Sequence, residues 1–328
     1  MTTGSELSAS MSAIAHTDAD KTDADTSAPD RRPGLPVLAA AITMIFWASA
    51  FVVIRALSGA LDPGPLALGR LLVGAILLTV IALARPRRAP IRIPRGRPLV
   101  MIIAYGVLWF GVYTIAVNAA GRYLDAGTSA MIVNLAPVIV AVLAGIFLGE
   151  GFPRQLVLGL AIAFAGVVII ASASRTGVVD PLGVALALTA AALYAVGVLL
   201  QKQALATVDP VTVTWLGAVA GAVATLPFLP QLITQLASEP AAVTFGVVYL
   251  GVFPTAIAFL LWTYALSRTS AGRMAASSYV VPGIAVLLSW LFLGETPAAI
   301  ALVGGAVSLL GVALTRLPAS RARSTRRS

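Results

Sequence analysis

The sequence of 328 residues contains no cysteine, so it offers no disulfide, no thiolate nucleophile and no cysteine-based metal site. Its one histidine, His16, lies in a polar stretch without the convergent partners that a metal ligand or a catalytic base needs. Neither a nucleophile–base pair nor a glycine-rich phosphate loop stands out. We therefore predict no metal site, no cofactor and no enzymatic activity.

Charged residues are also scarce. They make up 11% of the chain, against roughly a quarter in soluble domains, whereas 59% of the residues are hydrophobic and the mean hydropathy is +0.95. A soluble chain of this length could not bury so much apolar surface, which indicates that lipid surrounds most of it. Because the apolar runs are too long for strands and do not alternate, we predict an all-α integral membrane protein.

Ten apolar segments follow one another from Leu35 onward, most of them near the ~20 residues that an α-helix needs to cross a bilayer. Their connections are short and carry turn signals such as Asp62-Pro63 and Asp209-Pro210. The predicted segments are 36–56, 65–84, 98–119, 124–148, 154–173, 181–201, 211–231, 241–266, 272–293 and 297–316.

The fourth and ninth segments are two copies of one pattern. The stretch 125–150 recurs 145 residues later, with Pro137 matched by Pro282 and a final Phe-Leu-Gly-Glu that ends at Glu150 and again at Glu295. One register kept through Gly, Pro and Glu together indicates an internal duplication. Each copy holds five crossings, an odd number, so the second copy enters from the opposite side. We therefore predict two inverted five-helix repeats.

The basic residues predict how the chain is oriented in the membrane, and the apolar segments between them set the bounds of the tails and repeats. With the N-terminus in the cytoplasm, eighteen Lys and Arg residues fall on the cytoplasmic side and three on the other. The basic stretch 85–97 has no interleaved aromatics, so we assign it to membrane topology and expect no nucleic-acid partner. We predict a disordered cytoplasmic tail at 1–33, repeats at 34–174 and 175–316, and a basic cytoplasmic tail at 317–328.

The chain resembles the EamA-type transporters of the drug/metabolite transporter superfamily. The resemblance rests on Arg70 and on three stretches, FWASAFVVIRAL (46–57), NLAPVIVAVLAGIFLGE (134–150) and YVVPGIAVLLSWLFLGE (279–295). It covers roughly residues 35–316. It implies a ten-helix carrier of the bacterial inner membrane, often an exporter of amino acids or other small metabolites, with a central cavity between its halves.

Aromatic residues are the first candidates for binding a small-molecule substrate in such a cavity. Tyr105, Trp109 and Tyr113 recur at every fourth position, which places them on one face of the third segment. Trp47 in the first segment is matched by Tyr194 in the sixth at an offset of 147 residues. We predict that these five side chains line the cavity, with plain packing between helices as the alternative.

Polar residues beside the two matched prolines are further candidates. Asn134 and Tyr279 occupy equivalent positions ahead of Pro137 and Pro282, and Ser278 precedes Tyr279. A proline bends its helix and frees a carbonyl group, and polar side chains beside such a kink suit a substrate pocket. Hydrogen bonding between neighbouring helices is the alternative explanation.

Charges inside the predicted crossings are almost absent. Arg70 is the one exception, and it is either an anchor that reaches toward the interface or a counter-charge near the outer mouth of the cavity. All thirteen acidic residues lie in the N-terminal stretch or at segment ends, as Glu150 and Glu295 do. At those ends we expect the two glutamates to cap loop amides or to pair with arginine. A buried carboxylate that relays protons is therefore not expected.

These features predict a carrier in the plasma membrane that exports small metabolites such as amino acids by alternating access. Bending at Pro137 and Pro282 would open one half as the other closes. Without a carboxylate at mid-membrane, we expect transport to follow the gradient of the cargo or an exchange. The alternatives are efflux of a drug-like compound, uptake of a metabolite, and a membrane receptor or scaffold that transports nothing. The sequence names neither the cargo nor the oligomeric state.

Overall fold

The structure is a computed structural model, and every element that it describes is a helix. It describes residues 34–86, 92–147, 158–159, 161–162, 164–166, 168–169, 179–269, 271, 274, 277–295 and 297–314. The predicted tails, Glu150 and most of the predicted segment 154–173 lie outside these residues.

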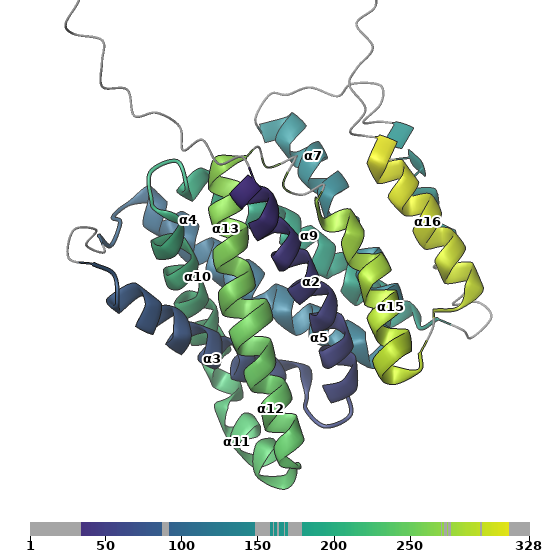
Figure 1. Ribbon diagram of the computed structural model, residues 1–328, viewed down its shortest axis with the longest axis horizontal. Coiled ribbons are helices and arrows are strands. Elements are labelled where there is room, and N and C mark those ends of the chain that lie inside the picture. The colour runs from purple at the N-terminus through teal and green to yellow at the C-terminus, as the bar shows by residue number, and fades with distance from the viewer. Residues whose placement is uncertain are drawn as a thin grey trace, which may run out of the picture. The chain divides into compact units, whose positions relative to one another are not determined.

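The helices are arranged as Figure 1 shows, and their contacts join the chain from Pro36 onward into one unit. In chain order they are α2 (Gly34–Leu57), α3 (Pro63–Leu83), α4 (Arg97–Tyr105), η1 (Gly106–Val112), α5 (Tyr113–Tyr123), α6 (Ala126–Val133), α7 (Ala136–Phe147), α9 (Pro181–Ala204), α10 (Pro210–Thr225), η3 (Leu226–Phe228), α11 (Leu229–Ser238), α12 (Ala241–Leu250), η4 (Gly251–Ile257), α13 (Ala258–Arg268), η5 (Ser278–Val280), α15 (Val281–Leu293) and α16 (Ala299–Leu314).

Among the described residues, six helical stretches are long and apolar enough to cross a membrane. They are Gly34–Leu57, Pro63–Leu83, Arg97–Tyr123, Pro181–Ala204, Pro210–Ser238 and Ala241–Arg268. They correspond to the first, second, third, sixth, seventh and eighth predicted segments. The fourth, ninth and tenth appear as shorter apolar helices, at Ala126–Val140, Ser278–Leu293 and Ala299–Gly311. The prediction of an all-helical membrane protein is therefore confirmed for the part of the chain that the structure describes.

Aspartate residues begin four of the described helices. Asp125, Asp180 and Asp209 each accept a hydrogen bond from a backbone N–H of the first turn, while Asp62 at the start of α3 bonds to side chains instead. A proline follows Asp62, Asp180 and Asp209 directly, and its fixed φ and missing N–H suit the first helical position. The Asp-Pro pairs that read as turn signals therefore begin helices.

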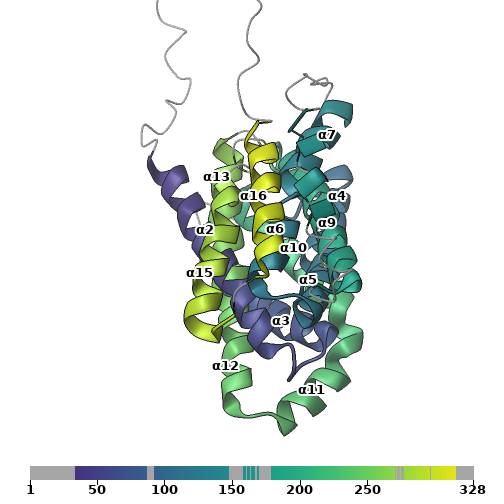
Figure 2. The ribbon, with the colours of Figure 1, turned by 90° about the vertical axis from the view of Figure 1, so that its right-hand side faces the viewer.

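Two of the long helices each contain a π-helical turn. η1 lies between α4 and α5, and η4 lies between α12 and α13. Their first residues, Gly106 and Gly251, are 145 positions apart, which is the offset of the predicted duplication. The two helices run in opposite directions, because α4 lies above α5 in Figures 1 and 2 whereas α12 lies below α13. Such turns concentrate at functional sites, and the sequence pattern does not predict them.

The two matched prolines stand where helices restart. Asn134 and Leu135 separate α6 from α7, in which Pro137 is the second residue. Pro282 is the second residue of α15 and follows the 3₁₀ turn η5. A proline costs little at these positions, because the N–H groups in the first turn of a helix have no acceptor within the helix that a proline could remove. Each predicted kink is therefore a break between two helical pieces.

Candidate functional site

A cavity of about 590 Å³, with the open space at its mouth included, lies between helices of both predicted repeats. The described residues that line it are Trp47, Ala50, Phe51, Ile54, Arg70, Trp109, Tyr113, Val117, Val133, Asn134, Tyr194, Phe259, Ser278 and Val281.

Aromatic rings form a continuous part of the cavity wall. The rings of Trp109 and Tyr194 meet edge to face at 4.7 Å between centroids, and Trp47 meets Tyr194 in the same way at 6.0 Å. Trp262 does not line the cavity, but it packs against Trp47 at 4.8 Å and is fully buried. The indole nitrogen of Trp47 donates to the carbonyl of Pro254 in η4 at 3.3 Å. Packing and hydrogen bonding thus hold the rings in place while part of their surface faces the cavity.

Arg70 of α3 is the one charged residue in the described lining of the cavity, and it is only 6% exposed. Its Nε donates to the hydroxyl of Thr255 in η4 at 3.0 Å. The Thr255 hydroxyl donates in turn to the carbonyl of Leu250 at 2.8 Å, which fixes the direction of its lone pairs. Neither terminal nitrogen of the guanidinium bonds or pairs with a residue that the structure describes.

Asn134 brings an amide to the cavity at the break between α6 and α7. Its nitrogen donates to the carbonyl of Ala130 at 3.1 Å, and its side-chain oxygen has no hydrogen-bond partner within the described chain. The residue is 6% exposed. Ser278, at the equivalent break ahead of α15, lines the same cavity. Both helix breaks therefore lie at the same cavity.

Two of the predicted binding residues lie away from the cavity. Tyr105 is fully buried one turn before Trp109, and its hydroxyl accepts a hydrogen bond from the Gln201 amide at 2.8 Å. The same amide donates to Thr263 at 2.9 Å, so Tyr105 belongs to a buried polar network. Tyr279 is half-buried and packs against the core without lining the cavity. The structure brings together the other seven candidates, Trp47, Arg70, Trp109, Tyr113, Asn134, Tyr194 and Ser278.

Other residues of the site were not among the predicted ones. Phe51 and Ile54 follow Trp47 by four and seven positions, so helical spacing could have placed them on the same face. Phe259 and Thr255 carried no comparable signal. Thr255 matters only through its contact with Arg70, which lies 185 residues earlier in the chain.

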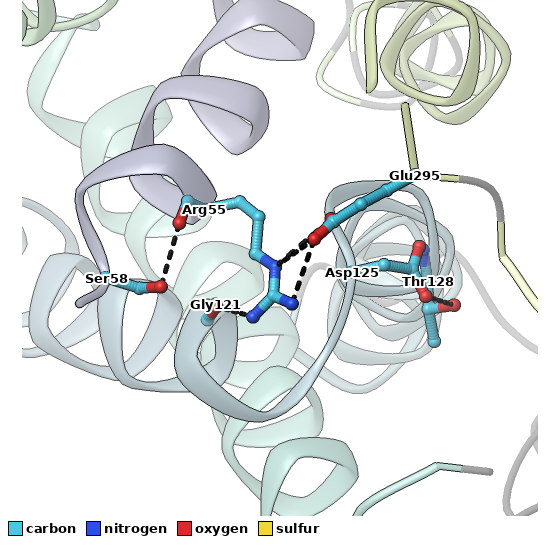
Figure 3. A network of polar contacts seen from close by, with 6 residues as sticks. All are labelled: Arg55, Ser58, Gly121, Asp125, Thr128 and Glu295. Carbon is cyan, nitrogen blue, oxygen red and sulfur yellow. Dashed lines mark hydrogen bonds and ion pairs between the residues drawn. The ribbon is translucent and has the colours of Figure 1, made fainter. Parts of the chain in front are cut away.

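An ion pair links the two predicted repeats beside the cavity (Figure 3). Arg55 follows the cavity residue Ile54 in α2, and its Nη2 lies 3.0 Å from a carboxylate oxygen of Glu295, just after α15. Arg55 also donates to the carbonyl of Gly121 near the end of α5 at 3.2 Å. Both charged side chains are about one-third exposed, at 30% and 33%. Glu295 thus pairs with an arginine, which is one of the two roles expected of it from the sequence.

Two further ion pairs lie at helix ends. Arg122 pairs with Asp62 at 2.6 Å, and hydrogen bonds from Gln235 and Arg122 lower the pKa of Asp62. Arg85 pairs with Asp209 at 2.8 Å. Partial burial raises the pKa of Asp209, but hydrogen bonds from Thr212 and Arg85 outweigh this effect and lower it. Both carboxylates therefore stay ionised at neutral pH.

Comparison with known proteins gives two matches to one family model, described as the EamA-like transporter family, over residues 34–172 and 181–317. A probable terminal-alkyne amino-acid exporter of Streptantibioticus cattleyicolor is 35% identical over 278 residues, covering 85% of this chain and 92% of the relative. A probable amino-acid metabolite efflux pump of Salmonella typhimurium is 25% identical and covers 83% and 92%. A solved structure at 20% identity has a TM-score of 0.62 and covers 87% of this chain and 98% of that one, a likeness of fold alone.

Proposed function

This chain belongs to the EamA-like transporter family, and from that premise we propose that it exports amino acids or similar small metabolites by alternating access. The relatives whose names mention amino-acid export or metabolite efflux support this cargo class. The cavity carries the proposal furthest. It lies between helices of both predicted repeats, and its aromatic wall and few polar groups suit a small amphipathic solute.

The proposed architecture has ten membrane-spanning helices in two inverted repeats, 34–174 and 175–316, with both termini in the cytoplasm. Three features support it. The family model matches the chain twice, π turns stand at equivalent positions of the two halves, and the helices that contain these turns run in opposite directions. A multi-pass protein of a transporter family with this orientation would lie in the plasma membrane.

The proposed mechanism uses the two helix breaks at the cavity. Asn134 and Ser278 line the cavity at these breaks, next to Pro137 and Pro282. A broken helix can change its angle at the break without disrupting the hydrogen bonds of either piece. None of the described lining residues carries a carboxylate that could take up and release a proton. We therefore expect the flux to follow the gradient of the cargo or an exchange.

The test is flux in proteoliposomes that contain the purified full-length protein. A panel of labelled amino acids, including aromatic ones, is loaded inside or outside, with and without an imposed pH gradient between pH 6 and pH 8. We expect saturable flux of at least one member that does not depend on the pH gradient. Asp62 and Asp209 have pKa values lowered from 3.8, so these carboxylates remain charged over this range and their ion pairs weaken only below it.

Absence of flux for every amino acid in both directions would count against the proposal and favour the drug-like cargo or the scaffold. A flux that follows the pH gradient, and loses this dependence in Glu295→Gln or Glu150→Gln, would show that a carboxylate at a helix end moves protons. That result would overturn the proposed driving force while leaving the carrier function in place.

A further inference from the structure

Arg70 presents to the cavity a positive charge that no described carboxylate compensates. A guanidinium stays protonated in proteins, and burying a charge is costly unless it is paired. No carboxylate in the described part of the chain lies within 4 Å of it. Asp62, Asp209 and Glu295 pair with other arginines, and Asp125 and Asp180 accept backbone N–H groups at helix starts.

The guanidinium is nevertheless held in a defined orientation. Thr255 accepts the Nε hydrogen bond, and its own proton goes to Leu250 five residues earlier, across the π turn η4. With Nε engaged, the two terminal nitrogens form a fork whose N–H groups have no described partner. Such a fork matches the two oxygens of a carboxylate, and charge-assisted bonds of this kind are about twice as strong as neutral ones.

The remaining polar atoms of the cavity complement an anion that also carries an amino group. The side-chain oxygen of Asn134 is buried beside the cavity without a described hydrogen-bond partner, and it is an acceptor of the kind that an ammonium group needs. The faces of Trp47 and Trp109 attract a cation or pack against an apolar side chain. Arg70 would repel a cargo that has a net positive charge, and without a carboxylate such a cargo makes no charge-assisted bond to the guanidinium that offsets this repulsion.

We propose that the terminal nitrogens of Arg70 bind a carboxylate group of the cargo, so that the cavity selects carboxylate-bearing solutes over their amides and amines. This inference rests on the proposed carrier function, since it assigns a role within the same cavity. It makes Arg70 a binding residue that determines specificity and Thr255 a positioning residue that orients it.

Matched probes test the inference directly. Binding of phenylalanine, phenylalaninamide, phenethylamine and 3-phenylpropanoate is measured by calorimetry on the full-length protein in lipid nanodiscs, together with the shift in melting temperature that each probe causes. We expect the wild type to bind the two carboxylates at least about tenfold more tightly than the amide and the amine.

Three variants separate binding from general effects on the fold. Arg70→Gln should lose the preference for carboxylates, and Arg70→Lys should keep only part of it because a lysine lacks the fork. Thr255→Val should weaken carboxylate binding several-fold while leaving the weak binding of the amide unchanged. Arg122→Gln is the matched control, because that arginine pairs with Asp62 outside the cavity and should leave the preference intact.

Equal affinity of the wild type for acid and amide, no binding of either carboxylate, or a preference that survives in Arg70→Gln would each overturn the inference. Flux of the same probes in proteoliposomes distinguishes this failure from that of the proposed function. Transport that is indifferent to Arg70→Gln contradicts the inference and leaves a carrier. Carboxylate binding that depends on Arg70 without any flux contradicts the carrier and leaves the binding site.

Discussion

Tyr113 and Tyr105 offer two hydroxyl groups on one helix with different expected roles. Tyr113 lines the cavity, and its hydroxyl makes no hydrogen bond to a described residue. We expect Tyr113→Phe to weaken cargo binding by about two- to tenfold, the worth of one hydrogen bond, and to leave the melting temperature unchanged. Binding and thermal unfolding in detergent measure both effects.

The Tyr105→Phe variant should behave in the opposite way. It removes the acceptor of a fully buried hydrogen bond from Gln201 without touching the cavity. We expect a loss of about 1 kcal/mol in the free energy of unfolding and unchanged cargo affinity. If Tyr105→Phe impairs binding more than Tyr113→Phe does, the assignment of these two residues is wrong.

Helical spacing predicts which side chains share a face of a helix, but it does not predict which of them line the cavity. Spacing places Trp109, Tyr113 and Tyr105 on one face, but it does not show how far the cavity extends along the helix. The cavity follows this helix from Trp109 to Val117, and one turn earlier Gln201 and Gly217 close in on Tyr105. Those neighbours come from the second half of the chain, so no local pattern reports them.

Among the elements, the π turn η1 depends on close packing against α10. A methyl group on Gly106 would overlap the carbonyl oxygen of Gly217, which is backbone and cannot move aside easily. We expect Gly106→Ala to lower the free energy of unfolding by about 1–3 kcal/mol, the usual cost of overpacking. Thermal unfolding in detergent measures it.

Gly111 in the same turn is the control for that substitution. A methyl group there would lie 3.8 Å from the side chain of Ala224, an ordinary contact. Gly111→Ala should therefore leave the free energy of unfolding unchanged within about 0.5 kcal/mol. Equal destabilisation by the two variants would mean that the π turn itself, and not its contact with α10, is sensitive to alanine.

Helix starts could be predicted from the sequence, whereas the π turns could not. An aspartate followed by proline caps and begins a helix through local chemistry, as Asp180 and Asp209 do, so the pair carries its own signal. The turns at Gly106 and Gly251 are held by contacts with distant helices, and their residues have the same apolar character as ordinary helical ones.

For the whole molecule, the ion pair between Arg55 and Glu295 should restrain one end of the cavity. It joins the first half of the chain to the second beside Ile54, which is 2% exposed. A pair this exposed contributes at most about 1 kcal/mol. Losing it would change the ratio of closed to open molecules by up to roughly fivefold and lower the free energy of unfolding by no more than the same ~1 kcal/mol.

The change in the ratio of closed to open molecules can be measured by thiol labelling. The chain contains no cysteine, so Ile54→Cys introduces a single thiol. We expect an impermeant maleimide added outside cells to label this thiol several-fold faster when Glu295→Gln is also present. Arg122→Gln is the matched control, since the described partners of Arg122, Asp62 and Leu61, both lie within the first half of the chain. Identical labelling rates in all three backgrounds would show that Arg55 and Glu295 do not hold this end closed.

The π turns also bear on how the molecule arose. A π turn is rare within an α-helix, and two unrelated π turns would have no reason to fall on matched positions. η1 and η4 begin at Gly106 and Gly251 and end at Val112 and Ile257, so they occupy the same seven positions of the two halves. If the two halves arose by the predicted duplication, the π turn is therefore older than the doubling of the gene, and the half-length ancestor already possessed it.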